Sequence, residues 1–586
     1  MSLFDDASLV LTPNGYKASK LYSIKPTSGL GDMTVVRATS ATRVNSAGLI
    51  EIARTNLVLQ SQTFENVYWV KNLGGVASAP VVTPNVETAP DGTTTADRVV
   101  FNLNGGTASG DISQLESALF SSVSITRTQS VYIKTTDGTT KVFTFVSPTG
   151  AATSITVTSV YQRFTWTTTA INAGTIRLRL RGSASGEGTA TSATIAIWGA
   201  QYEDGSVATD YIPTTTSIRT KFAGITQDGS SASNIPRIDY PPLGGCPSIL
   251  VEPQRTNLLT YSEQFDNAGW NKTNTTVTAN TTTSPDGTLT ADKIIPNTTN
   301  GTHNVNRSIT VSTSTAYTAS LYAKKGEYSG LRINFISSAN TFISVNLNTG
   351  VIQSFGGSIY LSSSIESVGN DWYRVTMTFL PPVATSSLNF IVENPVGTVT
   401  FAGDNTSGIY LWGAQLESGS NATSYIPTVA ATVTRNADSF TLNNIYTNGL
   451  LSASGGTWFV DLRNNIPLTR DANSVGLNLD TSLGSNGFAI RNNASAQRLT
   501  ISKYISNVRT ELYLTTTNTC KIAIKWNGTT ADIFENGTKV VSATSFTPTA
   551  MQVINGSSTD VSKNINQMSL WATPLTDTQL AILTTI

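Results

Sequence analysis

The sequence has few residues that can bind metals or form disulfides. It contains one histidine, His303, and two cysteines, Cys246 and Cys520, among 586 residues. A structural zinc site usually needs four cysteine or histidine ligands in a recognisable spacing, which these three residues cannot supply. We expect both cysteines to be free, buried thiols. His303 stands in an Asn-Gly-Thr-His-Asn segment typical of a loop, so we interpret it as a solvated polar residue rather than a catalytic base.

Charge is scarce and balanced. Lys and Arg together number 37, as do Asp and Glu, and charged residues make up only 13% of the chain. The balance leaves no overall field that would attract nucleic acid or an anionic membrane. Thr, Ser, Asn and Gly take the place of charged residues and give a neutral surface rich in hydroxyl and amide groups. Such a surface suits extracellular β proteins, fibres and surfaces that face glycans.

Export and membrane signals are also missing. The chain begins Met1-Ser-Leu-Phe-Asp-Asp, with neither the basic nor the apolar region of a secretory signal. No run of about 18 apolar residues occurs, so we expect no membrane insertion. A surface of extracellular type without an export signal indicates a virion component, assembled in the host cytoplasm and extracellular after lysis.

The common catalytic motifs are absent. The sequence has no G-x-S-x-G, no G-x-x-x-x-G-K-[ST] and no H-E-x-x-H. A glycosidase needs only two carboxylates, so candidates among the 37 acidic residues stay open. Glu203 and Glu417 occupy equivalent places in a repeat, which favours a structural role at a strand end over catalysis. We therefore expect a protein that is not an enzyme and has no cofactor, with Ca²⁺ as the one open possibility.

What the chain does contain is a long internal repeat. Arg54-Thr55-Asn56-Leu57 returns 201 residues later as Arg255-Thr256-Asn257-Leu258. Further along, Trp198-Gly199-Ala200-Gln201 returns as Trp412-Gly413-Ala414-Gln415, now at an offset of 214 residues. A changing offset indicates one scaffold used twice, with surface loops of different length.

Both copies have the pattern of β-sheet proteins. Short β-branched and aromatic runs alternate with Gly, Asp and Asn breaks, without a strong helical period. This pattern predicts tandem jelly-roll β-sandwiches, module 1 over residues 54–214 and module 2 over residues 254–428. In the strand that closes module 1, we expect Ala196, Trp198, Ala200 and Tyr202 on one face.

Two segments lie outside these modules on their N-terminal sides. Residues 1–53 contain too few large apolar groups to be securely stable alone, so we expect them to pack on a partner or on module 1. Residues 215–253 contain several prolines, which indicates a rigid, extended connector between the modules.

Residues 429–586 are expected to form a third sandwich of a different kind. The pairs Asn527-Gly528 and Asn536-Gly537, each between alternating runs, predict two tight hairpins. Thr576-Asp-Thr-Gln579 predicts a capping box that begins a short helix.

Two sets of matched residues are candidate binding groups. Asp91 and Asp286, in matched Pro-Asp-Gly-Thr turns, could supply oxygen ligands to Ca²⁺, although an ordinary turn with the carboxylate bonded to its own backbone is favoured. Matched tryptophans could stack on sugars, although their place in patterned segments favours core packing. These tryptophans are Trp69, Trp270, Trp198 and Trp412.

Several segments resemble a known family. Residues 7–17 and 37–51 resemble the N-terminal region of fibre-type structural proteins of tailed bacteriophages, in particular of crAss-like and other phages of Bacteroidetes hosts. Residues 250–265 and the Trp-Gly-Ala-Gln endings resemble the carbohydrate-binding-like jelly rolls of the same proteins. Trp526-Asn-Gly-Thr and Leu570-Trp571 are similar to segments of concanavalin A-like, or laminin-G-like, sandwiches.

The resemblance implies a head or tail fibre. Residues 1–53 would form a virion-attachment segment that contacts capsid, portal or tail proteins, and the distal domains would bind host-surface glycans. The family also implies a homo-oligomer, often a trimer. Because the chain lacks coiled-coil heptads, domain faces would have to hold such a trimer together.

Two other classes of protein stay open. A tailspike-type polysaccharide depolymerase, a glycoside hydrolase, would normally show a long parallel β-helix with short regular repeats, which the sequence lacks. A bacterial surface adhesin would normally carry an export signal.

Overall fold

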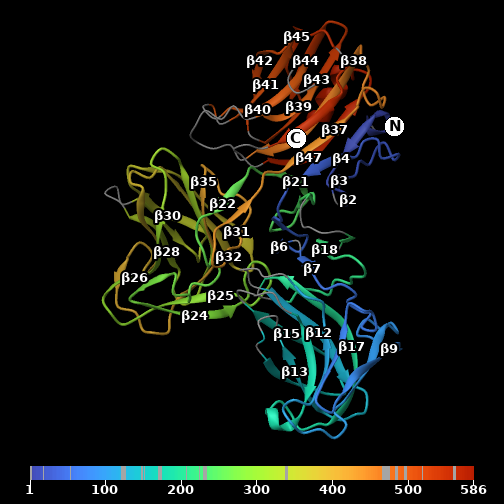
Figure 1. The fold of residues 1–586 in the computed structure, drawn as a ribbon. Coiled ribbons are helices and arrows are strands. Elements are labelled where there is room, and N and C mark those ends of the chain that lie inside the picture. The colour runs from blue at the N-terminus through green and yellow to red at the C-terminus, as the bar shows by residue number, and fades with distance from the viewer. Residues whose placement is uncertain are drawn as a thin grey trace. The chain divides into compact units, whose positions relative to one another are not determined.

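The structure is a computed structural model. It describes residues 3–17, 19–52, 54–120, 127–146, 150, 152–168, 175–205, 208–222, 225–228, 234–336, 341–464, 475–481, 486–493, 496, 498–517, 519–548, 550–557 and 563–585. Almost every element is a strand in an antiparallel sheet, so the prediction of an all-β fold is confirmed (Figure 1). No helix within these ranges has the length and apolar character needed to cross a membrane.

The chain forms two compact units that do not follow its linear order. Unit 1 comprises Met1–Ile52 and Ser233–Ile586, and unit 2 comprises Ala53–Ala232. Unit 2, which contains module 1, is therefore inserted into unit 1. The two segments that flank the insertion pair with each other inside unit 1, where Val44 N donates to Asp239 Oδ1 at 2.7 Å. The order of the modules along the sequence does not reveal this insertion.

Unit 2 is a jelly roll whose strands follow the order of two Greek keys. One sheet has the order β15-β12-β17-β10-β9, the facing sheet has the order β14-β13-β16-β11-β8, and a small sheet, β19-β18-β7, joins the first and last segments. Phe64, Phe101 and Tyr202 belong to the core between the large sheets. The strands are β7 (Arg54–Asn56), β8 (Val70–Gly74), β9 (Ser78–Glu87), β10 (Ala96–Asn102), β11 (Ile112–Glu116), β12 (Arg127–Thr135), β13 (Lys141–Val146), β14 (Ala152–Val157), β15 (Gln162–Thr168), β16 (Arg177–Arg181), β17 (Ser192–Asp204), β18 (Arg219–Phe222) and β19 (Ile225–Asp228).

Module 2 repeats this order inside unit 1. Its sheets run β24-β25-β35-β27-β32-β31 and β23-β26-β33-β28-β29-β30, with β30 and β31 as additions to the shared plan. β34 pairs with β26 beside this path, and β22 pairs with β36. The strands are β22 (Arg255–Asn257), β23 (Asn271–Thr273), β24 (Thr275–Thr282), β25 (Ala291–Pro296), β26 (Gly301–Thr310), β27 (Tyr317–Lys325), β28 (Gly330–Ile336), β29 (Thr341–Asn346), β30 (Val351–Gly356), β31 (Tyr360–Gly369), β32 (Trp372–Phe379), β33 (Thr385–Glu393), β34 (Thr400–Phe401), β35 (Ile409–Ser418) and β36 (Val433–Arg435).

The C-terminal sandwich takes strands from three parts of the chain. One sheet has the order β20-β21-β47-β38-β43-β44-β45, with β1 also paired to β47, and the other has the order β2-β3-β4-β37-β46-β39-β40-β41-β42. The C-terminal strands are β37 (Ser439–Asn443), β38 (Gly455–Asn464), β39 (Val475–Asp480), β40 (Gly487–Asn493), β41 (Arg498–Ile505), β42 (Val508–Leu514), β43 (Thr519–Asn527), β44 (Thr530–Glu535), β45 (Thr538–Ser545), β46 (Val553–Ser557) and β47 (Lys563–Trp571). The added strands are β1 (Leu9–Leu11), β2 (Tyr16–Lys17), β3 (Lys20–Leu21), β4 (Met33–Val36), β20 (Ile238–Asp239) and β21 (Ser248–Val251).

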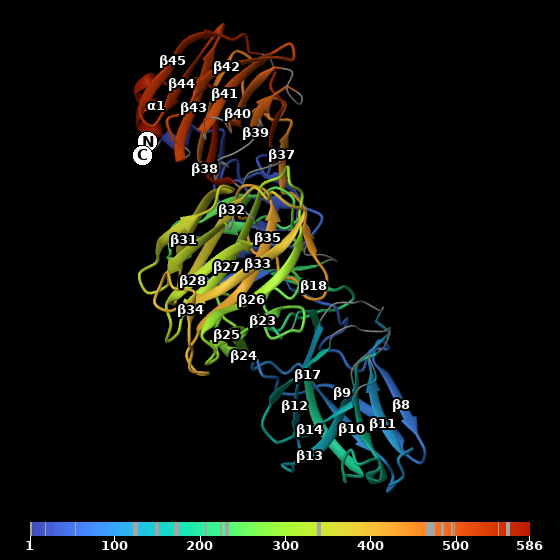
Figure 2. The same cartoon turned by 90° about the vertical axis from the view of Figure 1, so that its left-hand side faces the viewer.

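This arrangement corrects two expectations about the flanking segments. The N-terminal segment contributes strands to the C-terminal sandwich, where β1 pairs with β47 and β4 pairs with β37 (Figure 1). Figure 2 shows the same cartoon turned by 90°. Trp571 Nε1 also donates to Leu3 O at 3.0 Å. The connector is not a plain extended link, since β20 and β21 form a hairpin on the same sheet. Pairing with neighbouring strands satisfies main-chain groups of these two segments that would lack hydrogen-bond partners in an isolated segment.

The turn and capping signals of the C-terminal region are confirmed. Asn527-Gly528 joins β43 to β44, and Asn536-Gly537 joins β44 to β45. Helix α1 (Asp577–Thr584) begins with the predicted capping box, in which the Thr576 and Gln579 side chains each bond the backbone of the other residue.

The Arg-Thr-Asn motif at the start of each module has a structural explanation. Asn257 is fully buried, and its Nδ2 donates to Ala414 O at 3.1 Å and Ile426 O at 2.9 Å. Its Oδ1 accepts from Leu259 N and Leu416 N, each at 3.1 Å. Asn56 makes the same four kinds of contact in unit 2. Only an amide supplies two donors and an acceptor in this geometry, so asparagine fits both sites.

A cluster of buried ions joins the parts of unit 1. Arg237 bonds Glu252 at 2.6 Å and also pairs with Asp438, Arg37 bonds Asp438 at 2.7 Å, and Arg435 bonds Glu252 at 2.9 Å. All five side chains are at most 5% exposed. Burial raises the pKa of Glu252, but the charges of Arg435 and Arg237 outweigh it and hold that pKa well below its ordinary value. Arg435, which follows module 2, is therefore tied to Glu252 of the connector.

Two local expectations were wrong. His303 is fully buried in β26, where Nδ1 lies 2.6 Å from Asn274 O and Nε2 lies 2.8 Å from Phe401 O, so it is not a solvated loop residue. Both cysteines are free, but only Cys520 is buried. Burial raises the pKa of the Cys520 thiol to about 12, whereas Cys246 is exposed in the connector.

Candidate functional site

The tryptophans near the start of each module lie inside the sandwich cores. Trp69 and Trp270 are 4% and 1% exposed. Their indole nitrogens donate to the main-chain oxygens of Gln60 and Tyr261, each at 2.9 Å. A ring whose faces are covered by core side chains cannot stack on a sugar. The sugar-platform hypothesis is therefore wrong at these two positions, and the core alternative holds.

Trp198 faces away from the core because of a β-bulge at the next residue. Gly199 has a φ of 68°, and the register of β17 against β12 shifts there. The extra residue turns the strand, so that Ile197 and Ala200 both belong to the core while Trp198 belongs to a separate outer cluster. The expectation that Trp198 and Ala200 share a face is therefore wrong. Gly413, with a φ of 64°, makes the same bulge in module 2.

Trp198 and Trp412 are themselves covered. They are 5% and 1% exposed, and their indole nitrogens donate to Thr95 Oγ1 at 3.0 Å and Thr290 Oγ1 at 3.1 Å. Neither ring offers a free face, so the hypothesis that these tryptophans are stacking platforms is also wrong. Each of them instead supports other aromatic rings.

The two candidate calcium residues form ordinary turns. Asp91 Oδ1 accepts from Thr93 N at 3.0 Å and Thr93 Oγ1 at 2.6 Å. Asp286 Oδ1 does the same with Thr288 N and Thr288 Oγ1, at 2.9 and 2.7 Å. Within the described ranges, no group of three or more His, Cys, Asp or Glu side chains is placed to hold a metal ion. The geometry is that of an Asx turn, in which the carboxylate bonds its own backbone.

The candidate site of unit 2 is a group of tyrosines around Trp198, which we call the open aromatic cluster. It consists of Tyr132, Tyr161, Tyr211 and Trp198. The Trp198 ring centroid lies 5.5 Å from that of Tyr132 and 4.5 Å from that of Tyr211. Strand pairing produces this grouping, because Tyr132 on β12 lies opposite Trp198 on β17.

The tyrosines of the open aromatic cluster remain accessible within unit 2. Tyr132, Tyr161 and Tyr211 are each half-buried, in contrast to Trp198. Two cations accompany them, with the Arg163 guanidinium carbon 5.3 Å from the Tyr132 centroid and Lys134 Nζ 4.8 Å from the Tyr161 centroid. The cluster therefore presents partly exposed ring surface beside fixed hydrogen-bond donors. The repeated Trp-Gly-Ala-Gln motif pointed to the buried tryptophan and not to these tyrosines.

Module 2 carries the same arrangement, which we call the covered aromatic cluster. Its members are Tyr322, Trp372, Trp412 and Tyr425. The Trp412 centroid lies 5.4 Å from that of Tyr322 and 4.6 Å from that of Tyr425, and Arg374 lies 5.5 Å above the Tyr322 ring. All four aromatic side chains are at most 4% exposed.

A hairpin of the N-terminal segment covers this second cluster. The covering hairpin, residues 42–52, contains β5 (Thr42–Val44) and β6 (Ile50–Ile52). Ile50 packs among the rings, and its main-chain N donates to Pro285 O at 3.0 Å. Thr42 Oγ1 donates to Tyr425 O at 2.5 Å. The two clusters therefore differ mainly in what lies over them.

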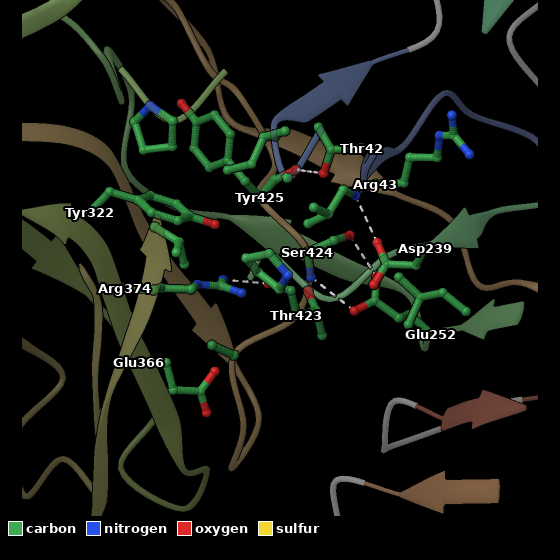
Figure 3. A pocket seen from close by; sticks show the side chains of 18 of the residues that line it. Thr42, Arg43, Asp239, Glu252, Tyr322, Glu366, Arg374, Thr423, Ser424 and Tyr425 are labelled. Atoms are coloured by element: carbon green, nitrogen blue, oxygen red, sulfur yellow. Dashed lines mark hydrogen bonds between the residues drawn. The ribbon is translucent and has the colours of Figure 1, made fainter. Parts of the chain in front are cut away.

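Between the covering hairpin and the covered aromatic cluster lies a cavity of about 190 Å³ (Figure 3). Tyr322 and Arg374 enter it from one side, and Asp239 and Glu252 approach from the opposite side. The Arg374 guanidinium donates to Thr423 O, which fixes its direction. A space this large with both polar and apolar walls is more than a packing defect, since folded cores leave few voids larger than one water.

Asp239 is a carboxyl group in the wall of this cavity whose pKa is shifted upward. Burial raises its pKa to about 6, although Val44 N donates to Oδ1 at 2.7 Å. Arg237 and Arg43 lower the same pKa but do not outweigh burial. The carboxyl group therefore changes its charge near neutral pH.

Glu203 and Glu417, the matched acids of the repeat, have structural roles. Both are fully buried. Glu203 Oε1 accepts from Thr209 N at 2.8 Å, and Glu417 Oε2 accepts from Thr423 N at 3.0 Å. Each carboxylate also accepts a hydrogen bond from the hydroxyl of the same threonine. Acids held in this way fasten the segment that follows the closing strand and are out of reach of a substrate.

No protein-family model and no curated protein matches the chain. Among solved structures, it is similar to botulinum neurotoxin type C, whose cell entry depends on two ganglioside molecules, with 13% identity, a TM-score of 0.21 and coverage of 25% of this chain and 39% of that chain. It is also similar to the CBM22-1-CBM22-2 tandem domain of Paenibacillus barcinonensis Xyn10C, with 12% identity, a TM-score of 0.22 and coverage of 62% of this chain and 98% of that chain. A third similar structure is the LG1-3 region of the laminin alpha2 chain, with 9% identity, a TM-score of 0.13 and coverage of 78% of this chain and 95% of that chain. TM-scores this low support no argument about function.

Proposed function

We propose that the protein is a structural component of a tailed-bacteriophage virion, a head or tail fibre that adheres to host-surface glycans through the open aromatic cluster of unit 2. The observation that carries the glycan part is the half-buried state of Tyr132, Tyr161 and Tyr211 around a buried tryptophan. Aromatic rings that keep part of their surface accessible while being held rigidly by a neighbour lose little entropy when they pack against a ligand.

The chemistry around the rings suits a neutral polyol. The rings offer apolar surface to the C–H groups of a sugar, and the hydroxyls of Thr93 and Thr95 lie 2.6 Å apart beside Trp198. Arg163 and Lys134 add donors for ring oxygens and hydroxyls. The net charge of zero and the low charged fraction leave recognition to these local groups rather than to a long-range field.

The virion part of the proposal is supported by the resemblance of residues 7–17 and 37–51 to phage fibre proteins. Unit 1 would contact other virion proteins, and several copies of the chain would form a homo-oligomer such as a trimer. In this proposal the protein is not an enzyme, and the matched acids Glu203 and Glu417, which are buried in hydrogen bonds to threonine, have structural roles.

The glycan part is tested with full-length protein and host-surface polysaccharide. We expect binding by the unaltered chain and at least a tenfold loss in Tyr161→Ala, because truncation removes a whole ring from the platform. Tyr446→Ala serves as the control, since Tyr446 is 38% exposed in another part of the chain. Absence of binding by the unaltered protein, or equal binding by both variants, contradicts the glycan proposal. Release of reducing ends would instead identify a depolymerase.

The location is tested separately by immunogold imaging of purified phage particles with an antibody against the C-terminal sandwich. Labelling of the head or the tail supports the fibre assignment and distinguishes the two kinds. Particles that lack the polypeptide exclude it.

A further inference from the structure

We propose that the cavity under the covering hairpin binds a single neutral sugar unit of hexose size. This inference rests on the proposed function, because it assigns the ligand class of the open aromatic cluster to its covered copy. A tyrosine with an arginine over its ring occurs in both places, since Tyr322 and Arg374 in unit 1 correspond to Tyr132 and Arg163 in unit 2.

Polar side chains in the cavity wall have hydrogen-bonding capacity that the protein leaves unused. Among the residues that the structure describes, none bonds the Tyr322 hydroxyl, the Glu366 carboxylate or Asp239 Oδ2. In Figure 3 the Tyr322 hydroxyl points toward the space that Asp239 borders from the other side. Carboxylates accept and a phenol both donates and accepts, which matches the hydroxyl groups of a sugar.

The apolar walls and the volume limit the ligand to one ring. Val44, Ile50 and Val368 line the cavity beside Tyr425. Its 190 Å³ is far more than the roughly 10–15 Å³ that one water requires. It is also below the ~300 Å³ at which sites for drug-sized ligands begin. A single hexose lies between these limits, and an oligosaccharide does not fit.

The charges of the wall favour a neutral ligand over an ion. Arg374 and Arg43 contribute positive charge, and Asp239, Glu252 and Glu366 contribute negative charge. Glu252 is already neutralised by its two arginine partners. A cavity whose wall carries both signs of charge gains little from binding an anion or a cation, whereas hydroxyl groups can bond to both kinds of side chain.

The covering hairpin makes the site selective for a free sugar or a chain end. Its turn approaches the connector closely: Gly48 has a φ of 78°, and a Cβ there would lie 2.4 Å from Pro242 O. With the main chains this close, a polymer cannot pass between the hairpin and the connector. Among the described residues of unit 2, no hairpin covers the open aromatic cluster, which can accommodate a longer chain.

The experiment uses the full-length protein and three separate probes, glucose, galactose and N-acetylglucosamine, with binding followed by saturation-transfer NMR. We expect at least one of these sugars to bind. Tyr322→Phe removes only the hydroxyl and should weaken that binding roughly fivefold to tenfold, the value of one hydrogen bond. Tyr446→Phe, the matched change outside the cavity, should leave the affinity unchanged.

The other possible results of this experiment decide between the cavity site and the open aromatic cluster. Absence of binding by all three sugars overturns the inference, as does equal affinity in Tyr322→Phe and the unaltered protein. Binding that survives Tyr322→Phe and is lost in Tyr161→Ala places the sugar at the open aromatic cluster alone; it overturns the cavity site and leaves the proposed function standing. Hexose binding that depends on Tyr322, in a protein that does not bind host polysaccharide, supports the cavity and contradicts the proposed function.

Discussion

Arg37 and Asn234 exchange two hydrogen bonds across 197 residues of sequence. Arg37 N donates to Asn234 Oδ1 at 2.8 Å, and Asn234 N donates to Arg37 O at 2.7 Å. The chain thus leaves unit 1 after Ile52 and re-enters it at Ser233. The next residue, Asn234, already bonds Arg37 of the first part of unit 1. Insertions of this kind are tolerated when both flanks are fixed by the host unit, because the inserted domain adds little strain to either.

Unit 1 should therefore fold without its insertion. We expect a variant in which residues 53–232 are replaced by a short Gly/Ser linker to be soluble and to retain the β-sheet circular dichroism of unit 1. Each doubling of loop length changes the closure cost by only about 0.6 kcal/mol, so a shorter connection should not destabilise the flanking segments. Calorimetry of the variant should lack the transition that belongs to unit 2.

A suitable control deletes residues 42–252, which removes the covering hairpin and the connector hairpin as well as unit 2. This control should fail to fold, because it deletes Arg237 and Glu252 from the buried ion cluster and β21 from the C-terminal sandwich. Aggregation of both variants would contradict the view that unit 2 is an independent insertion.

The buried ion cluster should depend strongly on its acids. Glu252→Gln leaves Asp438 as the one acid of the cluster beside three buried arginines, Arg37, Arg237 and Arg435, which should lower the free energy of unfolding of unit 1 by about 3–5 kcal/mol. Urea unfolding monitored by tryptophan fluorescence measures this loss of stability.

Glu51, 201 residues earlier in the repeat, provides the matched control. It pairs with Arg43 at 3.1 Å and is 23% exposed, so Glu51→Gln should cost about 1 kcal/mol or less. Equal losses in the two variants would show that burial does not set the value of these pairs.

Asn257 should not tolerate an acid. In Asn257→Asp, a carboxylate oxygen replaces the amide nitrogen that donates to Ala414 O and Ile426 O, so two carbonyl oxygens face negative charge in the core. We expect a loss of about 3 kcal/mol in the unfolding of unit 1. Asn56→Asp should affect unit 2 to the same degree. Asn300→Asp, at an exposed loop position, should be silent, and an effect there as large as at Asn257 would refute the explanation of the motif.

The repeat predicted the scaffold well because its matched residues fix the backbone. Asn56 and Asn257 bond the main chain in the same way, and Gly199 and Gly413 form the same bulge, so the matched residues produce the same jelly-roll plan in both modules. The Asn-Gly turns and the capping box were also predictable, since their contacts lie within a few residues.

The candidate sites were harder to predict because they depend on distant contacts. Whether Trp198 faces the core is decided by one bulge residue, which reverses the alternation of the strand. The burial of His303 depends on Phe401 O, 98 residues away. The covering hairpin lies over Tyr425 although 383 residues separate Thr42 from that residue. No local periodicity carries information of this kind.

Asp292 should make unit 1 less stable as the pH rises toward neutrality. Burial raises its pKa from 3.8 to about 6, despite hydrogen bonds from Asn280 N and Phe265 N. A folded-state pKa above the unfolded value means that the protonated acid stabilises the fold below about pH 4 and that this contribution is lost as the pH passes through 6. This difference in pKa corresponds to roughly 3 kcal/mol of folding free energy at most.

Urea unfolding of the unaltered chain and of Asp292→Asn at pH 4 to 7 should therefore give a stability difference that changes in this window, to the disadvantage of aspartate at the higher pH. Asp371→Asn, at a side chain that is 77% exposed, should give a curve parallel to that of the unaltered chain. Parallel curves for Asp292→Asn as well would mean that Asp292 does not bind its proton more tightly in the folded protein.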